Sequence, residues 1–138
     1  KNITVADDYA HHPTEIDAIL NAVKNAGYGR IIAVFQPHLY SRTRDFLDGF
    51  AKSLMKSDVT VVTGIYKARE ESIFGVESIN IVKIMKENGH ARAFYIDNMY
   101  NICDKLVPMV RPNDVIILMG AGDIWKIGKE LLKRIKNG

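Results

Sequence analysis

Short apolar runs alternate with amphipathic helical segments along almost the whole chain, and this alternation limits the possible folds more than any other feature. The run IIAVF at residues 31–35 is apolar at every position, as expected of a strand that is buried on both faces. Five such runs predict strands over residues 3–6, 31–35, 59–63, 92–96 and 115–119. The first predicted strand should stop at Asp7-Asp8.

Helical periodicity fills the segments between the predicted strands. One helix face is marked by the apolar residues Ile16, Ile19, Leu20 and Val23. Pro13 and Thr14 provide the start signal of this helix, and Gly27 with Gly29 provides its stop signal. Similar stripes predict helices over residues 46–54, 77–87, 99–107 and 124–135. Because parallel strands need crossover connections of this length, the pattern predicts a three-layer α/β fold with a mostly parallel sheet of five or six strands.

Length and composition fit one globular domain without special constraints. The chain has 138 residues, of which 47% are hydrophobic and 25% are charged. No apolar run approaches the ~20 residues of a membrane span, and the N-terminus lacks a signal-peptide pattern. We therefore expect a soluble, cytoplasmic domain without membrane contact. The single cysteine, Cys103, excludes an internal disulfide, and its apolar neighbours predict a buried structural thiol.

The formal net charge of +3 comes mostly from the last segment of the chain. Five cations and one acidic residue follow Trp125. Cations in the last turns of a helix complement its dipole, so we interpret this segment as a cationic helix rather than a nucleic-acid surface.

Polar segments follow all five predicted strands. Ligands in open α/β sheets bind beyond the carboxyl ends of the strands, so these segments should form the functional edge. They cover residues 7–15, 36–45, 64–71, 97–98 and 120–123. The first three are the parts of the chain richest in polar, histidine and arginine residues, and we expect them to share one rim.

The segment after the second predicted strand contains the strongest candidate residues, which are His38, Arg42 and Arg44. Both arginines are expected near the start of a helix, where cations oppose the helix dipole. An anionic ligand would offset this cost by bidentate hydrogen bonds. The segment therefore favours a carboxylate or phosphate site over a merely solvated surface.

The acidic and histidine residues after the first predicted strand allow more than one interpretation. Asp7 or Asp8 fits either a ligand contact or a simple turn cap. His11 and His12 are adjacent and so point apart, and neither an i, i+4 partner nor a cysteine accompanies them. We therefore expect no metal site here.

The turn Gly120-Ala121-Gly122 precedes the last predicted helix and offers backbone N–H groups to an anion. Trp125 occupies the place of the third glycine of a dinucleotide-binding fingerprint, which argues against a dehydrogenase. A phosphorylatable receiver domain has a similar length and alternation. It would need an aspartate and a lysine where this chain has Gly64 and Gly120, so that class is rejected.

Four segments together resemble the C-terminal domain of the Mur ligases, and in particular of the UDP-N-acetylmuramate–L-alanine ligases. They are DDYAHHPTE, VFQPHLYSRTRDFLDGF, GIYKAREESIFGVES and GAGDIW. The resemblance covers essentially all 138 residues, and the string FQPHLYSRTR is its most specific part.

The resemblance implies a Rossmann-like domain of a three-domain enzyme. In that enzyme the first domain binds the UDP-sugar, and the central domain carries the ATP P-loop and the Mg²⁺ ligands. This chain contains no G-x-x-x-x-G-K-[ST] motif, so ATP and Mg²⁺ would be held mainly by the other domains. The implied reaction phosphorylates the substrate carboxylate, and the amine of L-alanine then attacks the acyl phosphate.

The resemblance also implies roles for individual residues. Arg42 with His38 would bind the carboxylate of L-alanine, Arg44 would be a weaker candidate, and Tyr9 would line the same pocket. The implied substrate-side loop comprises Gly120, Ala121, Gly122 and Asp123, with Tyr66 near its mouth. Asp8 and His11 would face the nucleotide.

No residue is nominated as a general base, and the roles of Gln36 and Tyr40 stay open between substrate contact and bracing of the loop. Two alternative functions also stay open. One is a free-standing, non-catalytic module that binds a small carboxylate, an amino acid or a partner protein. The other is a structural relic whose rim tolerates Arg42→Ala and His38→Ala without losing a ligand.

Overall fold

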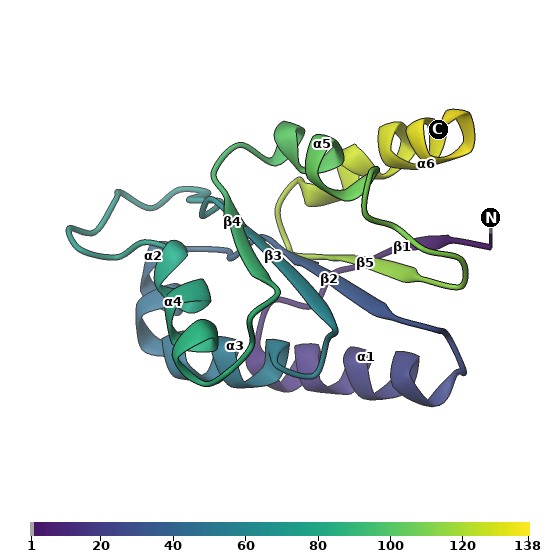
Figure 1. Ribbon diagram of the computed structural model, residues 1–138. Helices are drawn as coiled ribbons and strands as arrows, with labels where there is room; N and C mark the ends of the chain where they lie inside the picture. Colours follow the sequence, from purple (N-terminus) through teal and green to yellow (C-terminus); the bar gives the residue numbers. More distant parts are fainter. Residues whose placement is uncertain (1) are drawn as a thin grey trace.

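The computed structural model describes residues 2–138 as a five-stranded sheet between two layers of helices (Figure 1). The strands lie in the order β1-β5-β2-β3-β4, and every neighbouring pair is parallel. Their bounds are β1 Thr4–Asp8, β2 Ile31–Phe35, β3 Val59–Thr63, β4 Ala93–Ile96 and β5 Val115–Met119. The predicted three-layer α/β fold is confirmed.

Residues 2–138 also form six α-helices and two 3-10 helices, where the sequence predicted five helices. In chain order they are α1 Pro13–Asn25, α2 Tyr40–Asp45, α3 Leu47–Leu54, α4 Ile79–Glu87, η1 Met99–Asn101, α5 Ile102–Leu106, η2 Ile124–Ile127 and α6 Gly128–Asn137. Helices α1, α3 and α4 cover one face of the sheet, and α5 and α6 cover the other (Figure 1).

The central strand β2 contributes to both hydrophobic cores because its side chains alternate between the two faces. Ala33 and Phe35 belong to the core beneath α1, α3 and α4. Ile32 and Val34 belong to the core that contains residues of α5 and α6. Cys103 lies buried in this second core, which confirms the predicted structural thiol, and burial raises its pKa.

Several predicted boundaries differ from the structure, and two of the differences lie at the polar edge of the sheet. The first strand does not stop before Asp7-Asp8, because both residues pair with β5 through their backbones. An edge strand can include such residues, since its side chains reach solvent while its main chain stays in the ladder. The second predicted helix does not begin at Phe46. The backbone there (φ −118°, ψ 24°) leaves helical geometry and separates α2 from α3.

Helix α1 begins as its sequence predicts, but with an additional cap. Pro13 is its first residue, and the imidazole of His12 accepts a hydrogen bond from the backbone N–H of Thr14 at 3.2 Å. Glu15 completes a capping box by accepting from the backbone N–H of His12. Among residues 2–138 no helix is long and apolar enough to cross a membrane.

Candidate functional site

The loops after β1, β2, β3 and β5 are joined at the carboxyl edge of the sheet. The backbone N–H of Leu39 donates to the carbonyl of Tyr66 at 2.9 Å, and the N–H of Tyr66 donates to the carbonyl of Pro37 at 2.8 Å. The N–H of Gly120 donates to the carbonyl of Asp8 at 3.1 Å. The polar segments that were predicted to share one rim therefore do so.

His38 and Arg42 form a coupled pair on this edge. The ring of His38 stacks on Tyr66 with a centroid distance of 5.6 Å and an interplanar angle of 15°. The Nη1 atom of Arg42 lies 3.2 Å from Nδ1 of His38. Burial and the charge of Arg42 lower the pKa of His38. A neutral His38 accepts from Arg42 at Nδ1 and keeps Nε2–H as a donor, so the pair presents a guanidinium and a neutral donor together.

Arg44 does not join this pair. Its Nε donates to Oδ1 of Asp45 at 2.8 Å, and both side chains are exposed. The expectation that both arginines lie near a helix start holds only for Arg42, which is the third residue of the six-residue helix α2. Arg44 lies in the last turn, where a cation complements the helix dipole. Because α2 is so short, Arg42 belongs to its last turn as well, so the argument for an anion site depends on the His38–Arg42 geometry instead.

His11 brings the loop after β1 to the same place. Its ring centroid lies 6.2 Å from that of His38 and 5.4 Å from that of Tyr9. Its Nδ1 atom is 2.9 Å from the carbonyl oxygen of Tyr9. The Oδ1 atom of Asp8 accepts from the backbone N–H of Ala10 at 2.8 Å, so Asp8 does cap a turn. Tyr9 is exposed and lines a hollow beside α1.

A buried amide holds the turn after β5. The Oε1 atom of Gln36 accepts from the backbone N–H groups of Asp123 at 3.0 Å and Ile124 at 3.1 Å. The N–H of Gly120 is also occupied. Within this turn, the backbone N–H groups of Ala121 and Gly122 are therefore the ones that have no hydrogen-bond partner among residues 2–138. Any backbone contact from this turn to a ligand is therefore restricted to those two residues.

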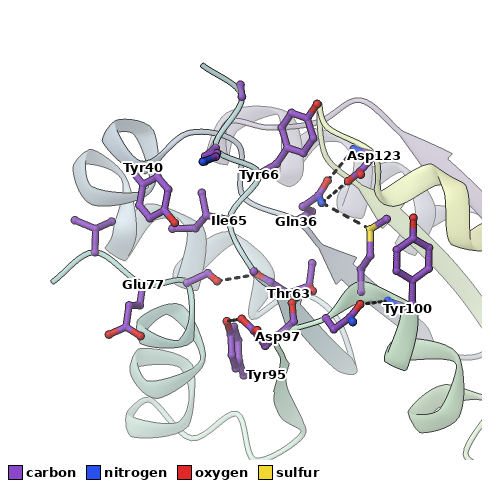
Figure 2. A pocket seen from close by; sticks show the side chains of 17 residues that line it. Gln36, Tyr40, Thr63, Ile65, Tyr66, Glu77, Tyr95, Asp97, Tyr100 and Asp123 are labelled. Carbon is purple, nitrogen blue, oxygen red and sulfur yellow. Dashed lines mark hydrogen bonds between the residues drawn. The ribbon is translucent and has the colours of Figure 1, made fainter. Parts of the chain in front are cut away.

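A cavity of about 700 Å³ opens between this turn and the ends of β3 and β4 (Figure 2). Of the predicted site residues, Tyr66 and Asp123 line it, together with Gln36 and Tyr40. The other predicted site residues lie outside its lining. The candidate site thus consists of the cavity and the adjacent His38–Arg42 pair, and Tyr66 belongs to both.

On the far wall of the cavity, the sequence analysis located Asp97 in a polar segment but missed Thr63 and Tyr95. The hydroxyl of Tyr95 donates to Oδ1 of Asp97 at 2.7 Å, and burial raises the pKa of Tyr95 to about 12. The hydroxyl of Thr63 donates to the carbonyl of Ile96 at 2.7 Å. A polar last residue in the apolar run of β3 was the available signal for this wall.

The contact between Ser41 and Glu70 was also missed. The backbone N–H of Ser41 donates to Oε1 of Glu70 at 3.1 Å, and the Ser41 hydroxyl donates to the other carboxylate oxygen. The hydroxyl contact lowers the pKa of Glu70. This pair fastens α2 to the loop after β3. No local pattern signals it, because its members are 29 residues apart.

The two adjacent histidines serve different local purposes. His12 caps α1, whereas His11 packs against Tyr9 and lies within 3.3 Å of Oε1 of Glu15. Within the described part of the chain, no group of three or more His, Cys, Asp or Glu side chains is arranged to hold a metal ion.

Comparison with known proteins gives a consistent family. The family model for the Mur ligase glutamate ligase domain matches residues 1–122. The UDP-N-acetylmuramate–L-alanine ligase of Pelotomaculum thermopropionicum is 44% identical over 134 residues, which are 97% of this chain and 29% of that protein. The ligase of the same name from Salinibacter ruber is 42% identical over 137 residues, or 98% of this chain and 29% of that protein.

A solved structure agrees with these relatives. The UDP-N-acetylmuramate-alanine ligase of Thermotoga maritima matches 98% of this chain and 27% of its own chain, with a TM-score of 0.77 and 29% identity. The chain spans about three-tenths of the length of the curated relatives. By sequence and by fold, this chain belongs to the Mur ligase family, as its glutamate ligase domain.

Proposed function

We propose that this chain is the C-terminal domain of an ATP-dependent ligase that joins L-alanine to UDP-N-acetylmuramate in the cytoplasm. The observation that carries the proposal is the His38–Arg42 pair beside the cavity, in which the His38 ring is stacked on Tyr66. A guanidinium next to a neutral imidazole donor suits a carboxylate, since both can donate to its oxygens.

In this proposal Arg42 and His38 bind the carboxylate of L-alanine. Binding fixes the amino acid so that its amine faces the acyl phosphate formed from the UDP-N-acetylmuramate carboxylate. The binding would raise the rate of amide formation by orientation, because two reactants that are held in line no longer have to meet by diffusion. Tyr66 and the Gly120–Asp123 turn border this subsite, and Arg44 and Tyr9 contribute less because both are exposed.

The nucleotide lies on the side of the loop after β1. Asp8 and His11 would face it, and the closeness of His11 and His38 supports adjacent nucleotide and amino-acid subsites. ATP and Mg²⁺ would be held mainly by the upstream domains of the same polypeptide, since this chain has no P-loop motif. The chain contributes binding and orientation, and no general base is assigned to it.

Steady-state kinetics on the full-length polypeptide tests the proposal. Arg42→Ala should raise the KM for L-alanine about ten-fold or more, because it removes a charged hydrogen bond, and leave the KM for ATP nearly unchanged. Arg92→Ala, at the opposite end of the sheet, is the matched control and should change neither constant. Equal increases in both constants for Arg42→Ala would refute the carboxylate assignment.

A further inference from the structure

Gln36 is a buried polar side chain to which the proposed reaction assigns no part. It follows β2 directly and is 5% exposed. Besides accepting two backbone N–H groups through Oε1, it donates from Nε2 to Oδ1 of Asp123 at 2.7 Å. Both ends of the amide are therefore used on this turn, and Nε2 also lies 3.8 Å from the sulfur of Met99, as the dashed lines in Figure 2 show.

The glycines of the turn fit closely around this amide. A Cβ atom at Gly120 would lie 2.9 Å from the carbonyl oxygen of Gln36. A Cβ atom at Gly122 would lie 2.7 Å from Oε1 of Gln36 and 2.5 Å from Cγ of Tyr66. Gly122 thus lies close to both the amide and the aromatic ring, so a shift of the turn toward Tyr66 would displace that ring.

Tyr66 transmits this placement to the candidate binding pair. Its ring is stacked on His38, and His38 in turn accepts from Arg42. The contacts form one continuous chain from the buried amide through the turn and Tyr66 to the guanidinium. Such a chain restrains the donors of the carboxylate subsite without any contact between Gln36 and the amino acid.

We propose that Gln36 is a positioning residue that fixes the Gly120–Asp123 turn and, through Tyr66, the orientation of His38 and Arg42. The inference rests on the proposed function for its kinetic consequence. The placement of His38 is a separate, structural consequence that can be measured without turnover.

The substitution Gln36→Glu separates positioning from simple filling of the core. The glutamate keeps the size of the side chain and the oxygen that accepts from both N–H groups. It replaces Nε2, which in the wild type donates to Oδ1 of Asp123 at 2.7 Å, by a second oxygen. Two carboxylates this close cannot both stay ionised at low cost, so the pair should take up a proton. Adding Asp123→Asn restores a donor opposite the new carboxylate, with donor and acceptor exchanged.

Kinetics of the full-length polypeptide are the first readout. Gln36→Glu should raise the KM for L-alanine about ten-fold at pH 8, and the increase should shrink toward pH 6 as the pair shares a proton. The double variant Gln36→Glu/Asp123→Asn should recover most of the loss at pH 8. Ser57→Ala is the control for lost stability, because Ser57 is equally buried and hydrogen-bonded at the opposite end of the sheet.

The second readout is the imidazole signal of His38 in the ¹³C-histidine-labelled full-length polypeptide, assigned with His38→Asn. Gln36→Glu should shift this signal, and the double variant should return it, whereas Ser57→Ala should not move it. An unshifted signal in Gln36→Glu would overturn the inference, as would a lower melting temperature with an unchanged KM for L-alanine. If the wild type shows no alanine-dependent ADP formation, the proposed function fails and the His38 signal alone decides the positioning role.

Discussion

The two ends of the sheet use arginine in opposite ways. At the amino end, Arg30 donates to both carboxylate oxygens of Asp114, at 3.1 and 2.9 Å, and to the carbonyl of Met109 at 3.1 Å. The Asp114 side chain is 1% exposed, and it also accepts from the backbone N–H of Arg111. At the carboxyl end, the guanidinium of Arg42 hydrogen-bonds one side chain of the described chain, that of His38.

This difference separates a structural arginine from one that is available to a ligand. Arg30 has its donors satisfied by a buried partner, so removing it leaves a charge without compensation. Arg42 has no carboxylate partner among residues 2–138, so its remaining donors are not engaged by a buried anion as those of Arg30 are. Arginine thus stabilises the fold at one end of the sheet, through Arg30, and is available to bind a ligand at the other end, through Arg42.

The largest expected effect is on stability, at the amino end. Arg30→Ala should lower the free energy of unfolding by about 3 kcal/mol or more, because Asp114 would stay buried without its cation. Arg42→Ala, the matched change at the other end, should alter it by less than about 1 kcal/mol. Chemical denaturation of both variants measures this, and similar losses would remove the contrast between the two ends.

The next effect comes from the crowded turn at the carboxyl end. Gly122→Ala should cost about 1–3 kcal/mol of stability, because its Cβ would overlap the Tyr66 ring, and should also raise the KM for L-alanine. Gly128→Ala is the control, since its Cβ would meet Leu118 at an ordinary 3.5 Å. A Gly122→Ala variant with wild-type melting temperature and kinetics would show that the turn is not tightly held.

A smaller effect is expected for the two adjacent histidines. His11→Ala should raise the KM for ATP several-fold, equivalent to about 1 kcal/mol, through loss of one polar contact. His12→Ala should instead lower stability by about 1 kcal/mol, because it removes the cap of α1, and should leave the KM for ATP unchanged. An unchanged nucleotide dependence in His11→Ala would remove His11 from the nucleotide subsite.

The smallest effect concerns pH. Folding lowers the pKa of His38 below its ordinary value of 6.5. At pH values just below 6.5, His38 therefore binds more protons in the unfolded chain than in the folded chain. The contribution of His38 to stability should therefore be complete above about pH 7 and should fall as the pH drops through this window. Urea unfolding measured from pH 5 to 8 gives the free energy of unfolding at each pH. This free energy should depend less steeply on pH in His38→Asn than in the wild type, and an identical pH dependence would contradict the lowered pKa.

Much of the fold was predictable because strands and helices have different periods. The five strands, the long helix α1 and the buried Cys103 follow from local apolar patterns. Helix α2 did not, since residues 40–45 are mostly polar and carry no apolar stripe, and the apolar Phe46 fits the stripe of α3 while its backbone leaves the helix. Periodicity reports which side chains are buried, and it does not report where a helix is interrupted.

The candidate site was predictable only in part. The segments at the strand ends were located correctly because parallel strands bring their carboxyl ends together. The hydrogen bonds between Gln36 and Asp123 and between Ser41 and Glu70 join residues 87 and 29 positions apart, which no local pattern encodes. The contacts of Thr63 with the carbonyls of Ile96 and Asp97 depend likewise on the pairing of β3 with β4.

The sequence by itself determined the class of fold, the edge that carries the polar loops and the family resemblance, because each depends on residue types at short, regular spacings. The tertiary structure decided which of these polar residues meet. In it Arg42 hydrogen-bonds His38, Arg30 hydrogen-bonds Asp114, and Gln36 hydrogen-bonds the turn after β5. Those pairings follow from strand order and loop packing, which bring distant residues within hydrogen-bonding distance only after the sheet has formed.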